Sequence, residues 1–436
     1  MIVPSAVESL LQMLAGDIVA QGIGNRVFQL FFALFRGCAV GVAVNTALCF
    51  GAGDFKECRR LAEQAYVTFL PAALLVTGMI FIFPALILRM FTGDPSILRA
   101  AAVYTKISIW GIPFMAATSV NTAAFQGRGD TRTPLAIAVF MNIVNICAGY
   151  IFIFGFRGIG GWGVTGAAAA GLISQAVGCG LGLYLLYRRN ASFSGARRDE
   201  RFFSLDKQRV RDIYAIGVPA ALENVTWQFS SIILSRVILG YGSVHFAAYQ
   251  LGLQTEIFFD LPCAGFVTAS AVLSSRAIGM RNGNLLRAYY KSMVKMIMLI
   301  SAFVAAALFG FPQVFMRILT DKPDIQMIGA GYVFFMGFAQ PLQSFGRVCG
   351  GFIRSSGGKR VPMYIAFIGI WCVRIPLALL FGAVLHLDIR FVWSAIAVDH
   401  LTRAAINFIY MRRCRVTNVV ERLYGGIPSE YGESQL

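Results

Sequence analysis

Three acidic residues lie inside long apolar stretches of the sequence, where a carboxylate has little water around it: Glu223, Glu256 and Asp260. Glu256 and Asp260, in the segment TEIFFDLPCAG, are four residues apart, so a helix places both on one face. Desolvation and a second nearby carboxylate both favour the protonated form of such a group. Ionisable groups are costly in apolar surroundings, so we predict that these three residues bind and release a coupling cation.

A purely structural role is the alternative for each of these acids. Glu223 lies near the start of its stretch, where the first-turn N–H groups of a helix would stabilise its charge. The pair in TEIFFDLPCAG would be neutralised by Arg236 or Arg374, which need counter-charges themselves. Asp399 and Arg403 are also four residues apart, and their spacing favours an ion pair within one helix.

Uncharged polar side chains also occur inside the apolar stretches. They are Asn142, Asn145, Gln228, Gln340 and Gln343. Asn142 and Asn145 share one face of a helix, and hydrogen bonding between helices would explain them without any ligand.

The composition is that of a protein embedded in a bilayer. Of the 436 residues, 57% are hydrophobic and only 14% are charged, which is outside the range of soluble globular domains. Eleven apolar stretches are long enough to cross about 30 Å of hydrocarbon as helices. They cover residues 27–50, 61–88, 100–125, 135–156, 164–186, 213–240, 246–275, 289–311, 328–352, 363–385 and 391–411. We therefore predict an all-helical, multi-pass membrane protein.

The positive charge is distributed in a way that argues against nucleic-acid binding. The formal net charge is +17, but Lys and Arg concentrate in every second connection between apolar stretches. These connections are residues 51–61, 127–134, 187–212, 276–287, 354–362 and 411–422. Such alternation is the positive-inside pattern. We expect a plasma (inner) membrane protein whose basic loops and C-terminus face the cytoplasm, with the lipid bilayer and no nucleic acid as its partner.

Catalytic and metal-binding patterns are missing from the sequence. The nine Cys are scattered singly, without a C-x-x-C pair, so the sequence indicates neither a disulfide framework nor a zinc site. No Ser-His-Asp or Cys-His arrangement stands out either. We expect no enzyme and no cofactor, apart from a transported H⁺ or Na⁺.

An internal repeat organises the chain. A shift of 228 residues aligns FPALILRMFTGDP, residues 83–95, with FPQVFMRILTDKP, residues 311–323. The same shift pairs Pro113 with Pro341 and Pro134 with Pro362. A single offset over such a distance indicates two copies of one six-helix unit. Because the number of helices in each copy is even, both copies should have the same orientation in the membrane.

The first helix of the first copy is short. Pro4 pairs with Pro219 and Glu8 with Glu223 at an offset of 215 instead of 228, so 13 residues are lost between about Gln12 and Gly16. Residues 1–15 as a helix would reach about 22 Å, less than the hydrocarbon thickness. We predict that helix 1 is truncated and does not cross the membrane as an ordinary span.

Several motifs in order give the chain a family resemblance. Each copy opens with P-x-x-x-E, and two further motifs are GAGDFKECRR at 51–60 and FQGRGDTRTP at 125–134. Together with LFRGCAVGVAVNTALCFGAGD at 34–54, they resemble the multidrug and toxic compound extrusion (MATE) family over nearly the whole chain. The resemblance implies an antiporter that exchanges H⁺ or Na⁺ for cationic or amphipathic organic compounds, by rocking of two lobes around a central cavity.

The resemblance also bears on the candidate residues. It places the helix face with Asn142 and Asn145 toward a cavity in the N-lobe, so we predict that both line the substrate cavity together with Gln228, Gln340 and Gln343. One departure concerns coupling. The family's aspartate in the second half of helix 1 falls inside the 13-residue gap, which leaves the C-lobe carboxylates as the coupling groups.

These observations predict a two-lobe transporter. The expected domains are an N-lobe at residues 1–187, a basic linker at 188–212, a C-lobe at 213–411 and a cytoplasmic tail at 412–436. We expect a monomeric secondary antiporter that exports organic cations or amphipathic drugs in exchange for H⁺ or Na⁺. Two alternatives stay open: a flippase for a lipid-linked precursor, with Arg36, Arg236, Arg347 and Arg374 as its candidate phosphate ligands, or a transport-deficient membrane protein with a degenerate helix 1.

Overall fold

The computed structural model describes residues 28–84, 88, 95–156, 159–160, 162–188 and 206–424. The secondary structure of these residues is helical except for a two-residue hairpin, in which β1 (Gly155–Phe156) pairs with β2 (Ile159–Gly160). Eight of the described helices are long and apolar enough to cross a membrane. The predicted all-helical, multi-pass fold is therefore confirmed, while the predicted truncation of helix 1 lies outside the described residues.

The helices belong to two compact units. Unit 1 contains the chain up to Thr46 and Phe55–Tyr214, and unit 2 contains Ala47–Asp54 and Ala215–Leu436. Two helices are shared by both units, namely Phe28–Gly51 and α9 (Lys207–Leu239). The other helices of unit 1 are α2 (Phe55–Ile82), α4 (Pro95–Ser108), α5 (Gly111–Gly127), α6 (Arg132–Phe154) and α7 (Gly163–Arg188).

Unit 2 adds longer helices and two π-helical segments. Its helices up to residue 355 are α10 (Ser243–Gly279), α11 (Gly283–Gly310), α12 (Pro312–Leu319) and α13 (Pro323–Ser355). The next span is divided into α14 (Val361–Phe367), the π-helix η1 (Ile368–Arg374), α15 (Ile375–Leu379) and the π-helix η2 (Leu380–Val384). The chain continues through α16 (Ile389–Arg413), the 3₁₀ turn η3 (Val416–Asn418) and α17 (Val419–Tyr424).

The repeat predicted from the sequence is visible in the backbone. α2 runs from residue 55 to 82 and α11 from 283 to 310, so both ends differ by 228. Pro95 starts α4 and Pro323 starts α13 at the same offset, because a proline fits the first turn of a helix, where its missing N–H would have no partner. Gly129 and Gly357, also 228 apart, both have positive φ angles, 85° and 97°, which glycine adopts without strain.

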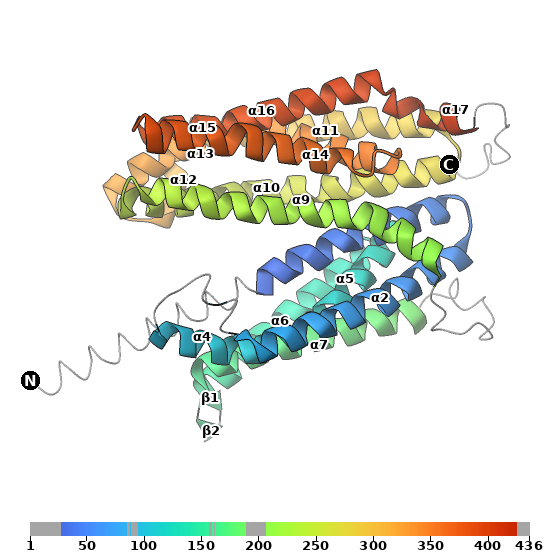
Figure 1. The fold of residues 1–436 in the computed structure, drawn as a ribbon, viewed down its shortest axis with the longest axis horizontal. Helices are drawn as coiled ribbons and strands as arrows, with labels where there is room; N and C mark the ends of the chain where they lie inside the picture. Colours follow the sequence, from blue (N-terminus) through green and yellow to red (C-terminus); the bar gives the residue numbers. More distant parts are fainter. Residues whose placement is uncertain are drawn as a thin grey trace, which may run out of the picture. The chain divides into compact units, whose positions relative to one another are not determined.

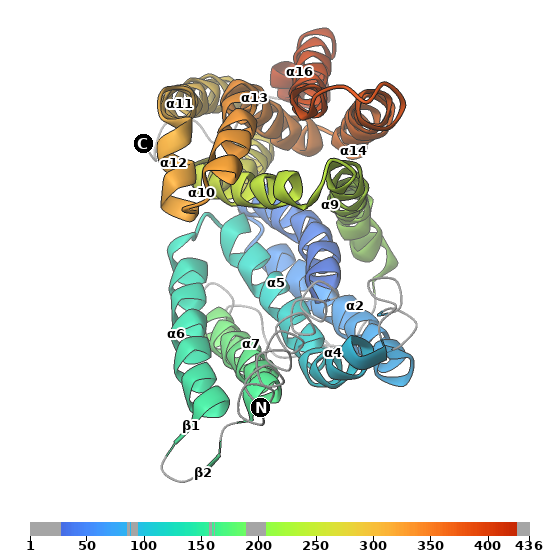
Figure 2. The same cartoon turned by 90° about the vertical axis from the view of Figure 1, so that its left-hand side faces the viewer.

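Small residues allow the helices of unit 1 to pack closely. Figure 2 shows α6 and α7 side by side, with the β1–β2 hairpin at their end. A Cβ atom on Gly166 would lie 2.3 Å from the Phe152 carbonyl oxygen, and one on Gly178 would lie 2.1 Å from the Met141 sulfur. The glycine and alanine run of α7 therefore serves helix packing, as expected for membrane helices.

In unit 2, α13 is the helix around which the others are arranged. It contacts α10, α11, α12, α14 and α16, and Figure 1 shows it among them. Close approach to α10 again depends on glycine, because a Cβ atom on Gly252 would lie 2.4 Å from the Tyr332 ring and one on Gly351 would lie 1.9 Å from the Ser270 hydroxyl. The helices α10 and α13 therefore approach closely at two separate points along their contact, and most of the candidate site lies between them.

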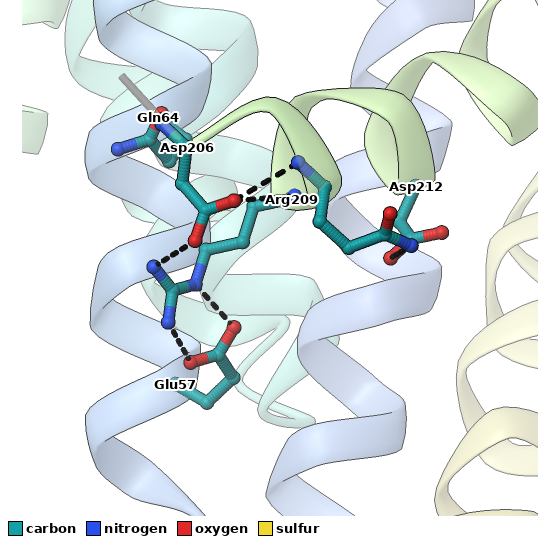
Figure 3. Close-up of polar contacts among 6 residues, drawn as sticks. Glu57, Gln64, Asp206, Arg209 and Asp212 are labelled. Carbon is teal, nitrogen blue, oxygen red and sulfur yellow. Dashed lines mark hydrogen bonds and ion pairs between the residues drawn. The ribbon is translucent and has the colours of Figure 1, made fainter. Parts of the chain in front are cut away.

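The first turn of α9 is fastened to α2 by a forked ion pair (Figure 3). The Arg209 guanidinium donates from Nε to Glu57 Oε1 at 2.6 Å and from Nη2 to Oε2 at 3.0 Å. Its Nη1 binds Asp206 Oδ2 at 2.7 Å, and the Asp206 backbone N–H donates to Gln64 Oε1 at 3.1 Å. This bidentate geometry fixes where α9 begins relative to α2 within unit 1.

Removal of this fork tests its contribution to stability. Because both partners are about one quarter exposed, we expect Arg209→Ala to lower the free energy of unfolding by only about 1 kcal/mol. Thermal unfolding of the purified protein in detergent measures the change. Arg211→Ala, an exposed residue of the same helix, is the control. An equal loss of stability in both variants would show that the fork contributes nothing specific.

Asp130 caps the start of α6. Its carboxylate accepts hydrogen bonds from the backbone N–H groups of Arg132 and Thr133, at 3.1 and 3.0 Å, and from the Thr133 hydroxyl at 2.6 Å. Partial burial alone would raise the pKa of Asp130, but these hydrogen bonds and the nearby Arg128 lower it overall. A carboxyl group with a lowered pKa stabilises the fold above its unfolded pKa, and this contribution is lost as the pH falls through the folded pKa.

We therefore expect Asp130→Ala to destabilise the protein by about 1 kcal/mol at neutral pH, as for loss of a helix cap. The difference from the wild type should shrink in strong acid, where Asp130 is protonated. Unfolding midpoints of both proteins across an acid pH series would check this. A difference that grows as the pH falls contradicts the assignment.

Candidate functional site

The two carboxylates of α10 face α13, but each has a different partner there. Glu256 is buried, 8% exposed, and its Oε2 accepts a hydrogen bond of 2.6 Å from the Tyr332 hydroxyl. Asp260 accepts a hydrogen bond of 3.0 Å from the Gln340 amide and forms an ion pair with Arg347. The cation beside Asp260 is therefore Arg347, and not Arg236 or Arg374 as the structural alternative proposed.

Aromatic rings pack around Tyr332, the side chain that binds the Glu256 carboxylate. The Tyr249 and Tyr332 rings meet edge to face, with centroids 5.3 Å apart, and Tyr332 meets Trp393 of α16 in the same way at 5.9 Å. Ala339 and Ala378 belong to the same buried cluster. These groups exclude water from the carboxylate and hold the Tyr332 hydroxyl in place.

Glu223 is also paired with an arginine. α9 begins at Lys207, so Glu223 lies about four turns inside the helix and does not contact first-turn N–H groups. That structural alternative is wrong because the helix starts earlier than the apolar stretch does. Glu223 instead accepts a hydrogen bond of 2.6 Å from Nη2 of Arg354, which lies in the last turn of α13.

A buried ion cluster occupies the contact between η1 and α16. The predicted pair of Asp399 and Arg403 is confirmed, at 2.8 Å. Arg374 of η1 also binds the Asp399 carboxylate, at 2.7 Å, and His400 lies beside both arginines. The sequence signal for this cluster was Arg374, whose span contains no acid, so its counter-charge had to come from another helix. The part played by His400 was missed.

The uncharged polar candidates fall into two groups. Gln340 and Gln343 are buried on α13, with Gln340 on Asp260 and the Gln343 Oε1 atom without a hydrogen bond in the described part of the chain. Asn142, Asn145 and Gln228 are exposed on the surface of their own units. The Asn142 amide donates to the Ala138 carbonyl of its own helix at 3.0 Å, so this contact does not join two helices.

The described residues hold no group of three or more His, Cys, Asp or Glu side chains that could bind a metal ion. The arrangement around α13 is instead a set of buried carboxylates with individual partners. Chemically, it can bind and release a proton or a small monovalent cation.

Comparison with solved structures shows the fold. A crystal structure described as MATE in the bent conformation matches with a TM-score of 0.85 and 21% identity, over 93% of this chain and 89% of that one. A MOP superfamily transporter from Pyrococcus furiosus matches with a TM-score of 0.81 and 22% identity, over 95% and 93% of the two chains. That structure is described as having a binding pocket of reverse polarity that suggests a different function.

Sequence relatives are similar over most of the chain. The probable multidrug resistance protein NorM of Thermotoga maritima is 26% identical over 93% of this chain and 90% of its own length. Multidrug and toxin extrusion protein 1 of Rattus norvegicus is 25% identical over 77% of this chain and 58% of its own length. The family model for MatE matches residues 9–151 and 219–380, which is more than half of the sequence, and the chain thus belongs to the MatE family.

Proposed function

We propose that the protein is a secondary active antiporter that exports organic cations or amphipathic drugs in exchange for H⁺. Its relatives include proteins described as multidrug resistance and multidrug and toxin extrusion proteins. The observation that carries the coupling step is the environment of Glu256. Among the unexposed carboxylates of unit 2 in the described residues, Glu223, Asp260 and Asp399 each bind an arginine, whereas Glu256 binds the neutral Tyr332 hydroxyl.

This difference decides which carboxylate can exchange its charge. Protonation of Asp260 would leave the Arg347 guanidinium without its counter-ion in a poorly solvated interior. Protonation of Glu256 breaks no ion pair, because its hydrogen-bond partner is the neutral Tyr332 phenol, which can rotate its hydroxyl or accept a hydrogen bond in turn. Glu256 is therefore the group on which a proton and a cation can replace one another.

The proposed cycle follows from that exchange. With Glu256 ionised, a substrate cation is attracted by the charge of the buried carboxylate. A proton that binds Glu256 removes the negative charge and the substrate leaves. Alternation of the two lobes between inward-open and outward-open states would make this exchange vectorial.

The remaining proposals concern orientation and assembly. The basic connections and the C-terminal segment are proposed to face the cytoplasm of a plasma membrane, in accord with the positive-inside pattern. The protein is proposed to act as a monomer, with Gln340 and Gln343 near the coupling site and Asn142, Asn145 and Gln228 as further cavity residues. A coupling role for Glu223 and Asp260 has less support than one for Glu256, because an arginine neutralises each of them.

The flippase alternative receives no support from the arginines that it requires. Arg347 and Arg374 are bound to carboxylates, and Arg36 and Arg236 are exposed. A transport-deficient protein would have the same fold but no flux. Uptake of ethidium into inverted vesicles under imposed H⁺ or Na⁺ gradients distinguishes the antiporter from a transport-deficient protein. We expect accumulation driven by a proton gradient, and absence of gradient-driven flux by a folded protein would contradict the antiporter.

A substitution tests the role of Glu256 directly. We expect Glu256→Gln to abolish proton-driven uptake and to weaken ethidium binding tenfold or more, since a buried charge partner is lost, about 1.4 kcal/mol for each factor of ten. Glu421→Gln makes the same chemical change on the exposed helix α17 and serves as the control. Proton-driven uptake by Glu256→Gln at the wild-type rate would assign coupling to another residue.

A further inference from the structure

The cluster at the η1–α16 contact carries a surplus positive charge. Both guanidinium groups bind the same atom, Asp399 Oδ2, from Arg374 Nη2 at 2.7 Å and from Arg403 Nη2 at 2.8 Å. The Asp399 side chain is fully buried, and the Arg374 and Arg403 side chains are 5% and 15% exposed. Two buried arginines therefore share one carboxylate.

His400 does not compensate for this surplus. Its Nε2 lies 3.1 Å from Arg374 Nη2 and its Nδ1 lies 3.1 Å from Arg403 Nη2. A neutral imidazole has only one acceptor nitrogen, so it can accept from one of the two arginines but supplies no negative charge. The cluster keeps a net charge of at least +1.

The surplus positive charge of the cluster acts on the Glu256 carboxylate. Arg354 and Arg347 each have a carboxylate of their own, Glu223 and Asp260, so the surplus lies on the Arg374–Arg403 pair. Arg374 lies one turn before Ala378, which packs in the same buried cluster as Tyr249 and Tyr332, and the Tyr332 hydroxyl binds Glu256. The charge of Arg374 therefore acts on the Glu256 carboxylate. Its guanidinium also covers the Trp227 ring of α9 at 5.5 Å, which limits its movement.

The fold does not need these charges. At the 228-residue offset, α7 has Gly171, Leu172 and Gln175 where α16 has Asp399, His400 and Arg403. The segments 133–154 and 163–187, which form the equivalent helix pair of unit 1, contain no Asp, Glu, Lys, Arg or His. There Met141 packs against Gly178, whereas in unit 2 a Cβ atom on Gly369 would lie 2.2 Å from Asp399 Oδ1. The same helix pair is built without ions in one copy and around them in the other.

We propose that Arg374, Asp399 and Arg403 are positioning residues that set the pH at which Glu256 exchanges its proton for a substrate cation. The proposal rests on the proposed function. Arg374 acts directly on Glu256 through its charge, while Asp399 and Arg403 act through Arg374, because they decide how much of its charge is neutralised. The surplus favours the ionised form of Glu256, the form that binds a cation.

Other charged and titratable groups around the two sites stay the same in all test variants. Tyr249 and Asp260 on α10 and Tyr332 and Arg347 on α13 surround Glu256. Around the cluster, the charges of Glu223 on α9 and Arg347 on α13 add to those within it. A shift between variants therefore reports the altered charge of the cluster.

Two single variants change the net charge of the cluster by one unit in opposite directions, and two further variants leave it unchanged. Arg403→Gln, the residue of the first copy at this register, lowers the net charge from +1 to 0, and Asp399→Asn raises it to +2. The double variant with both changes returns it to +1, and Arg403→Lys leaves it at +1. The measurement is the pH midpoint of ethidium binding to the purified protein, followed by fluorescence, together with proton-driven uptake into vesicles.

We expect the pH midpoint of ethidium binding to shift in opposite directions in the two single variants. As a general estimate, a unit charge that acts over about 10 Å in an effective dielectric of about 20 changes a titration midpoint by about one pH unit. Arg403→Gln should move it to higher pH, Asp399→Asn to lower pH, and the double variant and Arg403→Lys should keep the wild-type value. Loss of packing alone would lower binding in all variants without this order.

Each outcome decides between explanations. Midpoints that do not move, or that move in the same direction for both single variants, overturn the positioning role. If Asp399→Asn does not fold, the upward shift of Arg403→Gln, compared with the unchanged midpoint of Arg403→Lys, decides the matter. The proposed function fails separately, if ethidium binding by the wild type shows no dependence on pH or if Glu256→Gln keeps the same pH dependence as the wild type.

Discussion

The need to neutralise buried charge is the constraint on which unit 2 depends. A charged side chain in a poorly solvated interior is tolerated only with a partner, and here the partner usually comes from a different helix. Glu223 and Arg354 join α9 to α13, Asp260 and Arg347 join α10 to α13, and Arg374 and Asp399 join η1 to α16. Apolar packing can slide by a residue with modest loss, but an ion pair cannot. The pairs therefore fix the register of helices that small residues bring close together.

The same constraint separates structural from exchangeable carboxylates. An acid bound to arginine loses too much when it is protonated, because the guanidinium is left behind. An acid bound to a tyrosine hydroxyl can change its charge and keep a satisfied neighbour, as Glu256 can. The π-helical segment η1 supplies Arg374 to this arrangement, and π-helical turns occur frequently at functional sites. It ends at Arg374 and contains Gly369, which leaves room for the Asp399 carboxylate.

Local patterns in the sequence predicted much of the fold. Eight of the eleven apolar stretches correspond to described helices that are long and apolar enough to cross a membrane, while the stretch 100–125 is divided between α4 and α5. The 228-residue repeat reappears in the helix ends, because hydrophobicity, proline and glycine act within one element. The Asp399–Arg403 pair was predictable for the same reason, its residues being one helical turn apart. Ion-pair partners that come from different helices were not predictable from such local patterns. Arg347 lies 87 residues from Asp260, and the rotation of α10 against α13, which no local pattern encodes, decides between it and Arg374. The short helix α12 was missed because its eight residues are too few for an apolar window.

The two copies of the repeat act as an internal control for function. Both have helix ends at the same register, as in α2 and α11, both have turn glycines, and both use small residues for close contacts, so these features belong to the fold. The helices α5, α6 and α7 achieve this packing without a carboxylate, while α10 and α16 each bury acids that desolvation disfavours. A feature that one copy retains at a cost and the other copy does without is not explained by packing. Among the unexposed acids of unit 2 in the described residues, Glu256 binds the neutral Tyr332 hydroxyl and not an arginine, so the register of the helices does not explain its burial.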